Sequence, residues 1–481
     1  MPSPPFDETP SRTEREVEAA LGRYASCVDD WSAFASASRR RLCPAVWANP
    51  DRIDTEGLLA ELPGAVSVPW CGGAARWPSN RPGLHWAHRA GLYHVQEEAS
   101  LLPVALLDVR PGQRILDLCA APGGKTARIA FAVGPAGSVI ANEPQVKRHA
   151  ALNFNLHRLG LAQVTTTAID GRHFTDGDGF DRVLVDAPCT AEGNLTGNLR
   201  RKPVAPRDRI AIATRQRQLL SRGIDLCRPG GRIVYATCTY APEENEAVVE
   251  TVLRRDDVEL LEPSLPAELA VSRGLSAFEA MRFAPEVGGS ARLWPHLAGT
   301  GGFFVAALLK RGASPSKRPA AVPPAPGAEA LNLWDAIQER YDWPRDHGLV
   351  PIERGQSLSL VTAASRSSLT SFVSAGLPLI RRRKTSTKLA TPAALRLGRG
   401  ARRNVVQLEA HQVPRYQARH PLTLRPCQLV DASSGYVVVR YGPHALGMAM
   451  LRRSHASLLL VSEFPKAWAL PHDCTSAPRG A

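Results

Sequence analysis

The chain has 481 residues, of which 44% are hydrophobic and 22% are charged, and its formal net charge is +14. This length predicts about three domains of roughly 150 residues each, and no apolar stretch approaches the ~18 residues that a membrane helix needs. The positive charge favours a polyanionic partner such as nucleic acid, although a genome that favours arginine codons accounts for it equally well.

Residues 11 to about 85 predict a small α/β unit. The expected elements are a helix over 14–39, a strand over 44–48, a helix over 54–62 and a strand over 65–69. The basic run Arg39-Arg40-Arg41 suits a phosphate backbone, but a solvated helix end explains it as well. This segment is therefore a candidate RNA-binding domain, and the alternative is that its basic run is only a solvated helix end.

From about residue 86 to 310, short apolar runs alternate with helical segments. Repeated strand–helix units of this length predict an α/β fold with a mostly parallel sheet and helices on both faces. The expected strands are 114–118, 138–141, 164–167, 182–185 and 231–236, the expected helices begin near 125, 144, 207 and 242, and a late antiparallel strand covers 302–309.

The C-terminal third differs in composition from the predicted sheet domain. Residues 311–328 are biased to Pro and Ala and predict a semi-rigid linker. Beyond it lie an intermediate region over 329–425, which contains the basic cluster Arg381-Arg382-Arg383-Lys384, and a β-rich region over 426–481. We expect both regions to be separate from the sheet domain.

The nine cysteines are scattered, with no close pair at the spacing of metal ligands. This disfavours a zinc site, and an odd number in a cytosolic chain disfavours a disulfide framework. We expect no metal and mostly core-filling thiols. The N-terminal residues lack the basic start and apolar core of a signal peptide, so we expect a cytoplasmic protein, with no membrane partner and as a monomer.

Two of these cysteines follow runs that predict buried strands. Cys189 ends the run Asp186-Ala187-Pro188-Cys189 after the apolar residues 183–185, and Cys238 follows the run Arg232-Ile233-Val234-Tyr235. Both thiols are therefore expected at the carboxyl ends of neighbouring strands, where open α/β sheets place their sites. The residues alone leave open which thiol attacks.

The loop from Asp117 to Thr126 joins the first core strand to its helix. Gly123 and Gly124 allow a ligand to approach the backbone, and the helix N-terminus offers free N–H groups. The end of this loop, Gly124-Lys125-Thr126, is similar to a phosphate-binding P-loop, but that motif needs glycine where Cys119 stands. Walker-type ATP binding is therefore disfavoured.

Two acidic residues follow the next two predicted strands. Glu143 is placed to bind ribose hydroxyls, and Asp170 is placed to accept from an adenine amine. Each alone is as well explained by helix capping. Their occurrence in order, one per strand end, favours an adenosyl ligand without phosphates, namely S-adenosylmethionine (SAM).

These motifs together resemble the RNA cytosine carbon-5 methyltransferases of the Sun/Nop type, and most of all the bacterial 16S ribosomal RNA enzymes with a C-terminal PUA-like module. The motifs that carry the resemblance are Gly91-Leu92-Tyr93-His94-Val95-Gln96-Glu97-Glu98-Ala99-Ser100, the loop from Cys119 to Lys125, Asn142-Glu143, Asp170-Gly171-Arg172, Asp186-Ala187-Pro188-Cys189, Thr237-Cys238-Thr239 with Glu243-Glu244-Asn245-Glu246, Arg292-Leu293-Trp294-Pro295-His296 and Gly301-Gly302-Phe303-Phe304.

The resemblance implies a Rossmann-like class I methyltransferase core, a small N-terminal α/β domain and a β-rich PUA-like C-terminal domain. The implied domains are an RNA-binding domain over 1–85, a SAM-dependent methyltransferase domain over 86–310, a linker over 311–328, an intermediate domain over 329–425 and a PUA-like RNA-binding domain over 426–481. The implied product is 5-methylcytidine in 16S ribosomal RNA. A transfer RNA enzyme and a non-catalytic ribosome-assembly factor are the alternatives.

The resemblance also implies a role for each matching residue. The loop residues Cys119, Ala120, Ala121, Pro122, Gly123, Gly124 and Lys125 are expected to hold the methionyl and ribose part of SAM. Glu143 is expected to bind the ribose and Asp170 the adenine, while Asp186 lies between cofactor and base. Cys238 is expected to be the nucleophile, and Cys189 the thiol that assists product release.

The chemistry explains why these groups are needed. Carbon 5 of cytosine becomes nucleophilic only after a thiolate adds to carbon 6, so Cys238 needs surroundings that favour its thiolate. Lys125 is a candidate for that field, and Asp186 is expected to hydrogen-bond the base. A target base that must enter a pocket has to be unstacked first.

One loop departs from the family's pattern. The family usually has Ser-Gly and a short basic loop after the first cysteine, whereas here Cys189 is followed by Thr190-Ala191-Glu192-Gly193 and Asn194-Leu195-Thr196-Gly197-Asn198. The resemblance is also loose before the sheet domain and over 329–425. It therefore does not imply which cytidine is chosen.

Overall fold

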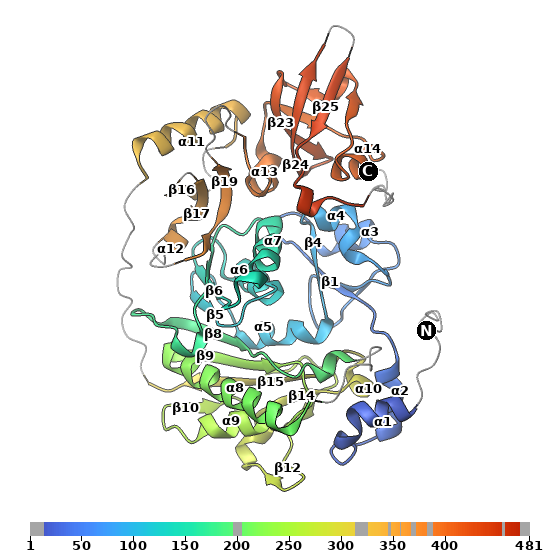
Figure 1. The fold of residues 1–481 in the computed structure, drawn as a ribbon, viewed down its shortest axis with the longest axis vertical. Coiled ribbons are helices and arrows are strands. Elements are labelled where there is room, and N and C mark those ends of the chain that lie inside the picture. The colour runs from blue at the N-terminus through green and yellow to red at the C-terminus, as the bar shows by residue number, and fades with distance from the viewer. Residues whose placement is uncertain are drawn as a thin grey trace. The chain divides into compact units, whose positions relative to one another are not determined.

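The computed structural model describes residues 14–195, 204–312, 326–344, 348–355, 357–366, 372–381, 388–454 and 457–471. The chain forms two compact units, and Figure 1 labels many of their elements. Unit 1 comprises Met1–Cys43, Glu97–Asp108 and Arg172–Pro315, and unit 2 comprises Pro44–Gln96, Val109–Gly171 and Ser316–Ala481. No helix among the described residues is long and apolar enough to cross a membrane.

Unit 1 contains a sheet with the strand order β11-β14-β15-β9-β8. β8 (Phe180–Asp186) runs parallel to β9 (Cys227–Thr237), and β15 (Phe303–Lys310) pairs antiparallel with β9, which confirms the predicted late strand. The other elements of unit 1 are α1 (Glu14–Leu21), α2 (Trp31–Arg39), α5 (Leu102–Leu107), the 3-10 helix η6 (Glu192–Leu195), α8 (Pro206–Leu226), α9 (Glu246–Leu253), β10 (Val258–Leu260), β11 (Ser272–Arg273), β12 (Ala277–Phe278), β13 (Met281–Arg282), β14 (Ala291–Leu293) and α10 (Pro295–Ala298).

Unit 2 contains the parallel strands β5 (Arg114–Asp117), β6 (Ser138–Asn142) and β7 (Val164–Thr167), followed by the antiparallel β18 (Ser374–Ala375). A second sheet has the order β2-β3-β1-β4. The elements up to residue 159 are β1 (Ala45–Ala48), α3 (Thr55–Glu61), β2 (Val66–Ser67), β3 (Ala74–Arg76), α4 (Trp86–Arg89), β4 (Tyr93–Gln96), α6 (Gly124–Val133) and α7 (His149–Leu159).

The C-terminal part of unit 2 contains a three-stranded sheet, β16-β17-β19, and a six-stranded sheet, β21-β25-β24-β23-β20-β22. Their elements are α11 (Ala328–Tyr341), β16 (Leu349–Arg354), β17 (Ser357–Thr362), α12 (Ala363–Arg366), β19 (Leu377–Arg381), α13 (Thr391–Leu397), β20 (Val405–Gln407), α14 (Gln412–Gln417), β21 (Leu422–Leu424), β22 (Leu429–Val430), β23 (Gly435–Tyr441), β24 (His444–Arg453) and β25 (Leu458–Ser462). Most of the predicted linker (313–325) and the cluster residues Arg382, Arg383 and Lys384 lie outside the described residues.

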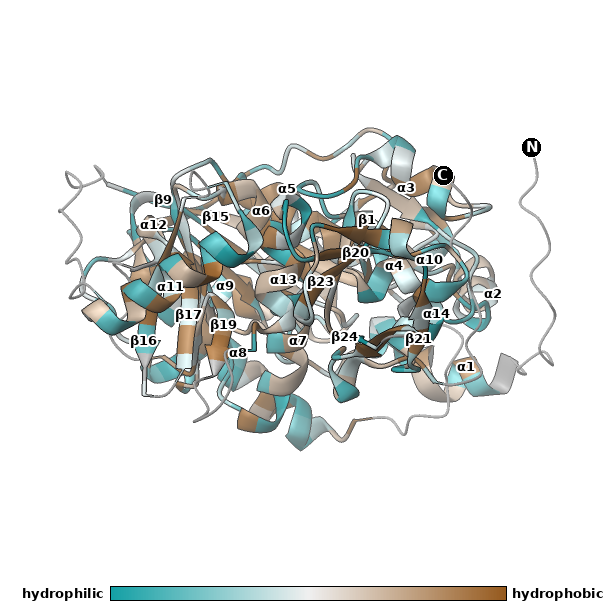
Figure 2. Ribbon diagram, turned by 90° about the horizontal axis from the view of Figure 1, so that it is seen from above, coloured by the Kyte–Doolittle hydropathy of each residue, from teal (hydrophilic) through white to brown (hydrophobic). Residues whose placement is uncertain are grey.

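The six-stranded sheet shares one hydrophobic core with the sheet of β1 and β4. Buried Val46 and Tyr93 belong to the same cluster as buried Tyr416 and Leu460. Strands β20 and β24 are drawn largely in the hydrophobic colour in Figure 2. A chain cut before the C-terminal region would therefore expose this core to water, which costs stability.

Three predicted helices begin or end at other residues than expected, and a side chain caps one of the observed starts. The helix expected over 14–39 is interrupted: α1 ends at Leu21, and α2 begins after Asp30, whose carboxylate accepts from Ala33 N–H at 2.9 Å. The helix expected from 242 begins at Glu246, because Asn245 bonds residues next to Cys238. The helix expected from 144 begins at 149.

Candidate active site

Both predicted cysteines lie just beyond the ends of adjacent strands in unit 1. β8 ends at Asp186, shortly before Cys189, and β9 ends at Thr237, directly before Cys238. Asp186 is paired with Ala236 across the parallel strands, so the carboxyl ends of β8 and β9 reach the same edge of the sheet. The two sulfur atoms are 3.4 Å apart. The structure thus brings the two thiols together as the sequence predicts.

A buried carboxylate in the segment after β9 holds the loop that carries Cys189. Glu244 accepts from the backbone N–H of Thr190 at 3.0 Å and from its hydroxyl at 2.6 Å. Gln216 on α8 donates to the same carboxylate and to the carbonyl of Pro188, both at 2.9 Å. Burial raises the pKa of Glu244, and the residues on both sides of Cys189 are fixed.

A second buried carboxylate, in the loop that carries Cys189, holds the loop that carries Cys238. Glu192 on η6, in the loop after Cys189, accepts from the hydroxyl of Thr239 at 3.0 Å and from Arg209 at 3.2 Å. The Tyr24 hydroxyl, from the N-terminal segment, also donates to it. Each cysteine loop is thus anchored by a carboxylate of the other loop. No local sequence pattern predicts this exchange, because its partners are far apart in the chain.

The surroundings of Cys189 keep its proton on sulfur. The pKa of Cys189 is raised well above its usual value, chiefly by its hydrogen bond to Cys238, then by burial and by the charges of Cys238 and Glu244. Cys189 is therefore a thiol at neutral pH, and its S–H group can donate to the sulfur of Cys238.

Sequence analysis does not identify Asn194, which contacts the predicted nucleophile. Its side-chain amide nitrogen donates to Sγ of Cys238 over 3.3 Å. The neighbouring Gly193 donates its backbone N–H to the carbonyl of Cys238 at 2.9 Å. Asn194 lies in the loop that departs from the family's pattern, so the resemblance offers no signal for it.

The predicted cofactor loop in unit 2 follows the end of β5. Thr126 on α6 donates to the carboxylate of Asp117 at 2.6 Å, and Gly123 has a positive φ of 103°. A Cβ on Gly124 would lie 2.8 Å from an oxygen of Gln96 and 2.9 Å from a nitrogen of His94. The packing against β4 therefore requires a glycine at 124, in addition to any role in ligand approach.

Glu143 lies directly after β6 and is buried. Its carboxylate accepts from the N–H of Gln145 at 2.9 Å and from Arg148 at 2.7 Å. Arg148 also donates to the carbonyl of Ala121 at 2.7 Å, which links Glu143 to the predicted cofactor loop. The structure therefore gives Glu143 a hydrogen bond to the segment before α7 and an ion pair with Arg148, but no helix-capping contact.

Asn142, part of a motif that sequence analysis quoted without a role, ties three strand ends of unit 2 together. Its amide nitrogen donates to the carbonyls of Leu118 at 3.2 Å and Ile169 at 2.9 Å, and its oxygen accepts from Thr167 at 2.9 Å. The loops after β5 and β7 are thereby fixed around the end of β6.

The remaining predicted residues are placed at strand ends and loops. Asp186 is partly exposed in unit 1, and Cys119, Lys125 and Asp170 are partly exposed in unit 2, where Ala120 and Ala121 are buried and Pro122 is exposed. Among the described residues, no group of three or more His, Cys, Asp or Glu side chains is arranged to hold a metal ion.

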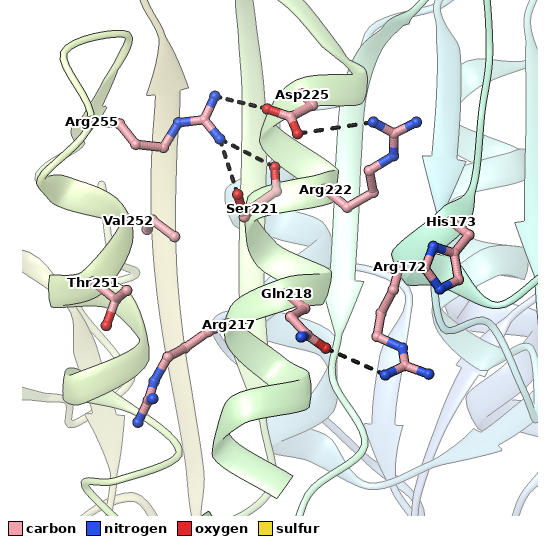
Figure 3. A pocket seen from close by; sticks show the side chains of 10 residues that line it. All are labelled: Arg172, His173, Arg217, Gln218, Ser221, Arg222, Asp225, Thr251, Val252 and Arg255. Atoms are coloured by element: carbon pink, nitrogen blue, oxygen red, sulfur yellow. Dashed lines mark hydrogen bonds and ion pairs between the residues drawn. The ribbon is translucent and has the colours of Figure 1, made fainter. Parts of the chain in front are cut away.

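A cavity of about 570 Å³ lies between α8 and α9 in unit 1, and its lining is rich in arginine (Figure 3). Arg255 donates to Asp225 at 2.8 Å and to the Ser221 hydroxyl at 3.1 Å, and Arg172 donates to Gln218 at 3.4 Å. None of the predicted site residues lines this cavity. Arg255 therefore links the segment after α9 to α8, and Arg172 links the segment after β7 to α8.

Comparison with known proteins decides the family. A family model described as 16S rRNA methyltransferase RsmB/F matches residues 104–309. The ribosomal RNA small subunit methyltransferase F of Salmonella schwarzengrund is 34% identical over 353 residues, which cover 65% of this chain and 70% of that protein. The chain belongs to the RsmB/F methyltransferase family. The Klebsiella pneumoniae protein of the same name is 33% identical over 317 residues, which cover 62% of this chain and 63% of that protein.

Two further likenesses agree with this RsmB/F assignment. The 26S rRNA (cytosine-C(5))-methyltransferase nsun-1 of Caenorhabditis elegans is 38% identical over 229 residues, 46% of this chain and 34% of that protein. A crystal structure of a methyltransferase homologue from Pyrococcus horikoshii has a TM-score of 0.52 and 29% identity, and covers 62% of this chain and 93% of that one. The predicted methyltransferase family and the Rossmann-like core are confirmed.

Proposed function

We propose that this RsmB/F chain transfers a methyl group from SAM to carbon 5 of a cytidine in 16S ribosomal RNA, through a covalent bond between Sγ of Cys238 and carbon 6. The observation that carries the proposal is the pair of sulfurs 3.4 Å apart at the ends of β8 and β9. A reaction that makes and then breaks a thiol adduct needs one group to attack and a neighbouring group to release it. The names of the relatives support the ribosomal substrate and the carbon-5 product.

The steps balance with these two sulfurs. Cys238 loses its proton to solvent, and its thiolate bonds carbon 6, so that the 5,6 double bond's electron pair makes carbon 5 nucleophilic. SAM, when bound, would supply the electrophilic methyl group that carbon 5 takes, and its sulfonium sulfur would keep the electron pair of the broken S–CH3 bond as a thioether. The carbon 5 proton then leaves to a base, the 5,6 double bond reforms, and the C–S bond breaks to return the Cys238 thiolate.

Cys189 is the proposed base, and its surroundings set the order of events. Before attack, the hydrogen bond to Cys238 and the charge of Cys238 hold the pKa of Cys189 high. Once the Cys238 sulfur is bonded to carbon 6, both of these influences are gone, and only burial and Glu244 still raise the pKa. Cys189 therefore loses its proton to solvent only after the adduct exists, when its thiolate is needed at carbon 5.

Asp186 and Lys125 are the proposed polar partners of the reaction. The carboxyl group of Asp186, partly exposed at the end of β8, suits a hydrogen bond to N3 or the amino group of the base. Lys125, in the first turn of α6, suits the positive field that a thiolate needs.

The residues of unit 2 fit SAM, which offers hydroxyl and amine groups but no phosphate. Gln145 and Arg148 each donate one hydrogen bond to the Glu143 carboxylate, and its remaining lone pairs suit ribose hydroxyls. Asp170 is the proposed partner of the adenine amine. The loop Cys119, Ala120, Ala121, Pro122, Gly123, Gly124 and Lys125 is the proposed seat of the methionyl group.

The substrate requires an RNA-binding surface beyond the reacting residues. The net charge of +14 favours phosphate contacts, and the six-stranded sheet at the C-terminus is the proposed PUA-like module. The N-terminal segment 1–85 is the second proposed RNA-binding part. A single-stranded or looped cytidine suits the reaction, because the base must leave its stack.

The decisive experiment compares two cysteine variants with tritiated SAM and 16S ribosomal RNA. Cys238→Ala should abolish methyl transfer and leave SAM affinity unchanged, because this thiol acts on the base. Cys189→Ala should accumulate a protein–RNA complex that survives denaturing electrophoresis, because elimination lacks its base. Full activity of Cys238→Ala, or no adduct with Cys189→Ala, would refute the assigned roles.

A further inference from the structure

The side-chain amide of Asn194 contacts the sulfur that the proposed reaction uses. Its nitrogen lies 3.3 Å from Sγ of Cys238 and donates to it. Asn194 is exposed, whereas Cys238 is only partly exposed, so the amide meets the sulfur at the solvent side of the site.

The backbone holds this amide in place. Gly193 donates its N–H to the carbonyl of Cys238 at 2.9 Å and accepts from the N–H of Gly302 at 3.1 Å. A Cβ on Gly193 would lie 2.1 Å from the carbonyl oxygen of Gly302, so the two backbones cross too closely for a side chain. Leu195, on the other side of Asn194, is buried. The donor is therefore positioned before any substrate binds.

We infer that Asn194 is a further catalytic residue, whose side-chain amide stabilises the thiolate of Cys238. An N–H group that donates to a sulfur favours its charged form, and a hydrogen bond to an ion is stronger than one to a neutral group. An amide does not titrate, so this donor acts at every working pH. The inference rests on the proposed function, because it assumes that Cys238 attacks as a thiolate.

The opposite orientation of the amide would have the opposite effect. If the oxygen of Asn194 faced the sulfur, it would accept from the S–H group and favour the neutral thiol, which raises the pKa of Cys238. The sign of the shift when Asn194 is removed therefore distinguishes the two orientations. The titratable groups on the neighbouring elements are Asp186 at the end of β8, Cys189 after β8, Glu192 on η6 and Glu244 before α9.

The test measures the thiolate of Cys238 in the full-length protein without RNA. The rate of alkylation by iodoacetamide is followed against pH, and peptide mass spectrometry assigns the label to Cys238. Asn194→Ala should raise the apparent pKa of Cys238 by about one unit, a tenfold loss of thiolate below that pKa. Asn194→Asp, which places an anion of the same shape beside the sulfur, should raise it further.

A matched control removes an amide elsewhere. Asn332 is exposed on α11, and Asn332→Ala should leave the alkylation profile of Cys238 unchanged. Methyl transfer by Asn194→Ala should be slow at low pH and recover as the pH rises, which a folding defect would not do. An unchanged or lowered pKa in Asn194→Ala would overturn the inference.

The result of the alkylation test does not depend on whether the proposed methyl-transfer reaction is correct. If Cys238→Ala still methylates RNA, the proposed function fails, whereas the effect of Asn194 on the sulfur is measured all the same. If Cys238→Ala is inactive and the alkylation profile ignores Asn194, the function stands and this inference falls.

Discussion

Removing the sulfur of Cys238 should make Cys189 more acidic. In the native protein, the hydrogen bond to Cys238 is the largest cause that raises the pKa of Cys189, followed by burial and the charge of Cys238. Cys238→Ala deletes the first and third causes and leaves burial and Glu244. The pKa of Cys189 should therefore fall, so that more of it is thiolate at any pH below that value.

The size of this fall follows from the separation of the two sulfurs. By Coulomb's law, two unit charges at the observed 3.4 Å interact by about 1 kcal/mol at the dielectric constant of water, and by about 5 kcal/mol at an effective value of 20. These energies correspond to about 1 and 3.5 pKa units. Because Cys189 is partly exposed, the lower end applies, and a fall of at least about one unit is expected.

Alkylation against pH, with mass spectrometry to assign the label, measures this shift in Cys238→Ala. Cys189 should react about tenfold faster than in the unaltered protein at a pH below both pKa values. Cys227 is an internal control: burial raises its pKa to about 12, and it should stay unreactive in both proteins. An unchanged profile of Cys189 would show that burial alone holds its proton, and would refute the proposed order of events.

The other predictions concern the cofactor residue and a buried ion pair. Glu143→Ala should weaken SAM binding, measured by calorimetry, by about 1.5–3 kcal/mol, as for a charged hydrogen bond, and Arg148→Ala should weaken it less. Unchanged affinity in Glu143→Ala would leave Glu143 only its contacts with Gln145 and Arg148. Glu246 and Arg292 form an ion pair with 0% and 1% exposed side chains, so Glu246→Gln should lower the unfolding free energy by about 3–5 kcal/mol. The ion pair of Glu262 with Arg273 is exposed, so Glu262→Gln should lower the unfolding free energy by less than about 1 kcal/mol. Equal losses of unfolding free energy for the two variants in a urea titration would contradict this reasoning.

The sequence predicts the strands and the two thiols well, because both depend on local patterns. Short apolar runs identify β5 to β9, and a cysteine placed directly after a buried strand must lie at its carboxyl end. The pairing of Asp186 with Ala236 then brings Cys189 and Cys238 together. The order of the strands along the chain and in the sheet accounts for the rest of the predicted arrangement.

The residues that sequence analysis missed act across long separations. Glu192 is held by Tyr24 and Arg209, and Asn194 is placed by the crossing of Gly193 with Gly302. No local pattern marks such contacts, because they exist only once distant segments have packed. The helix starts near 144 and 242 were predicted too early: the segments before α7 and α9 form local hydrogen bonds that involve the side chains of Glu143 and Asn245. The domain boundaries and the PUA-like assignment stay predictions.

The two carboxylates that link the cysteine loops affect both the separation of the sulfurs and the pKa of Cys189. Because Glu244 holds Thr190 while Glu192 holds Thr239, neither cysteine loop can shift without breaking a buried hydrogen bond of the other. This fixes the separation of the sulfurs without a covalent bond between them. The charge of Glu244 also raises the pKa of Cys189. The groups that set the geometry thus help to keep one sulfur protonated beside the other, as a reaction with one attacking thiolate and one waiting base requires.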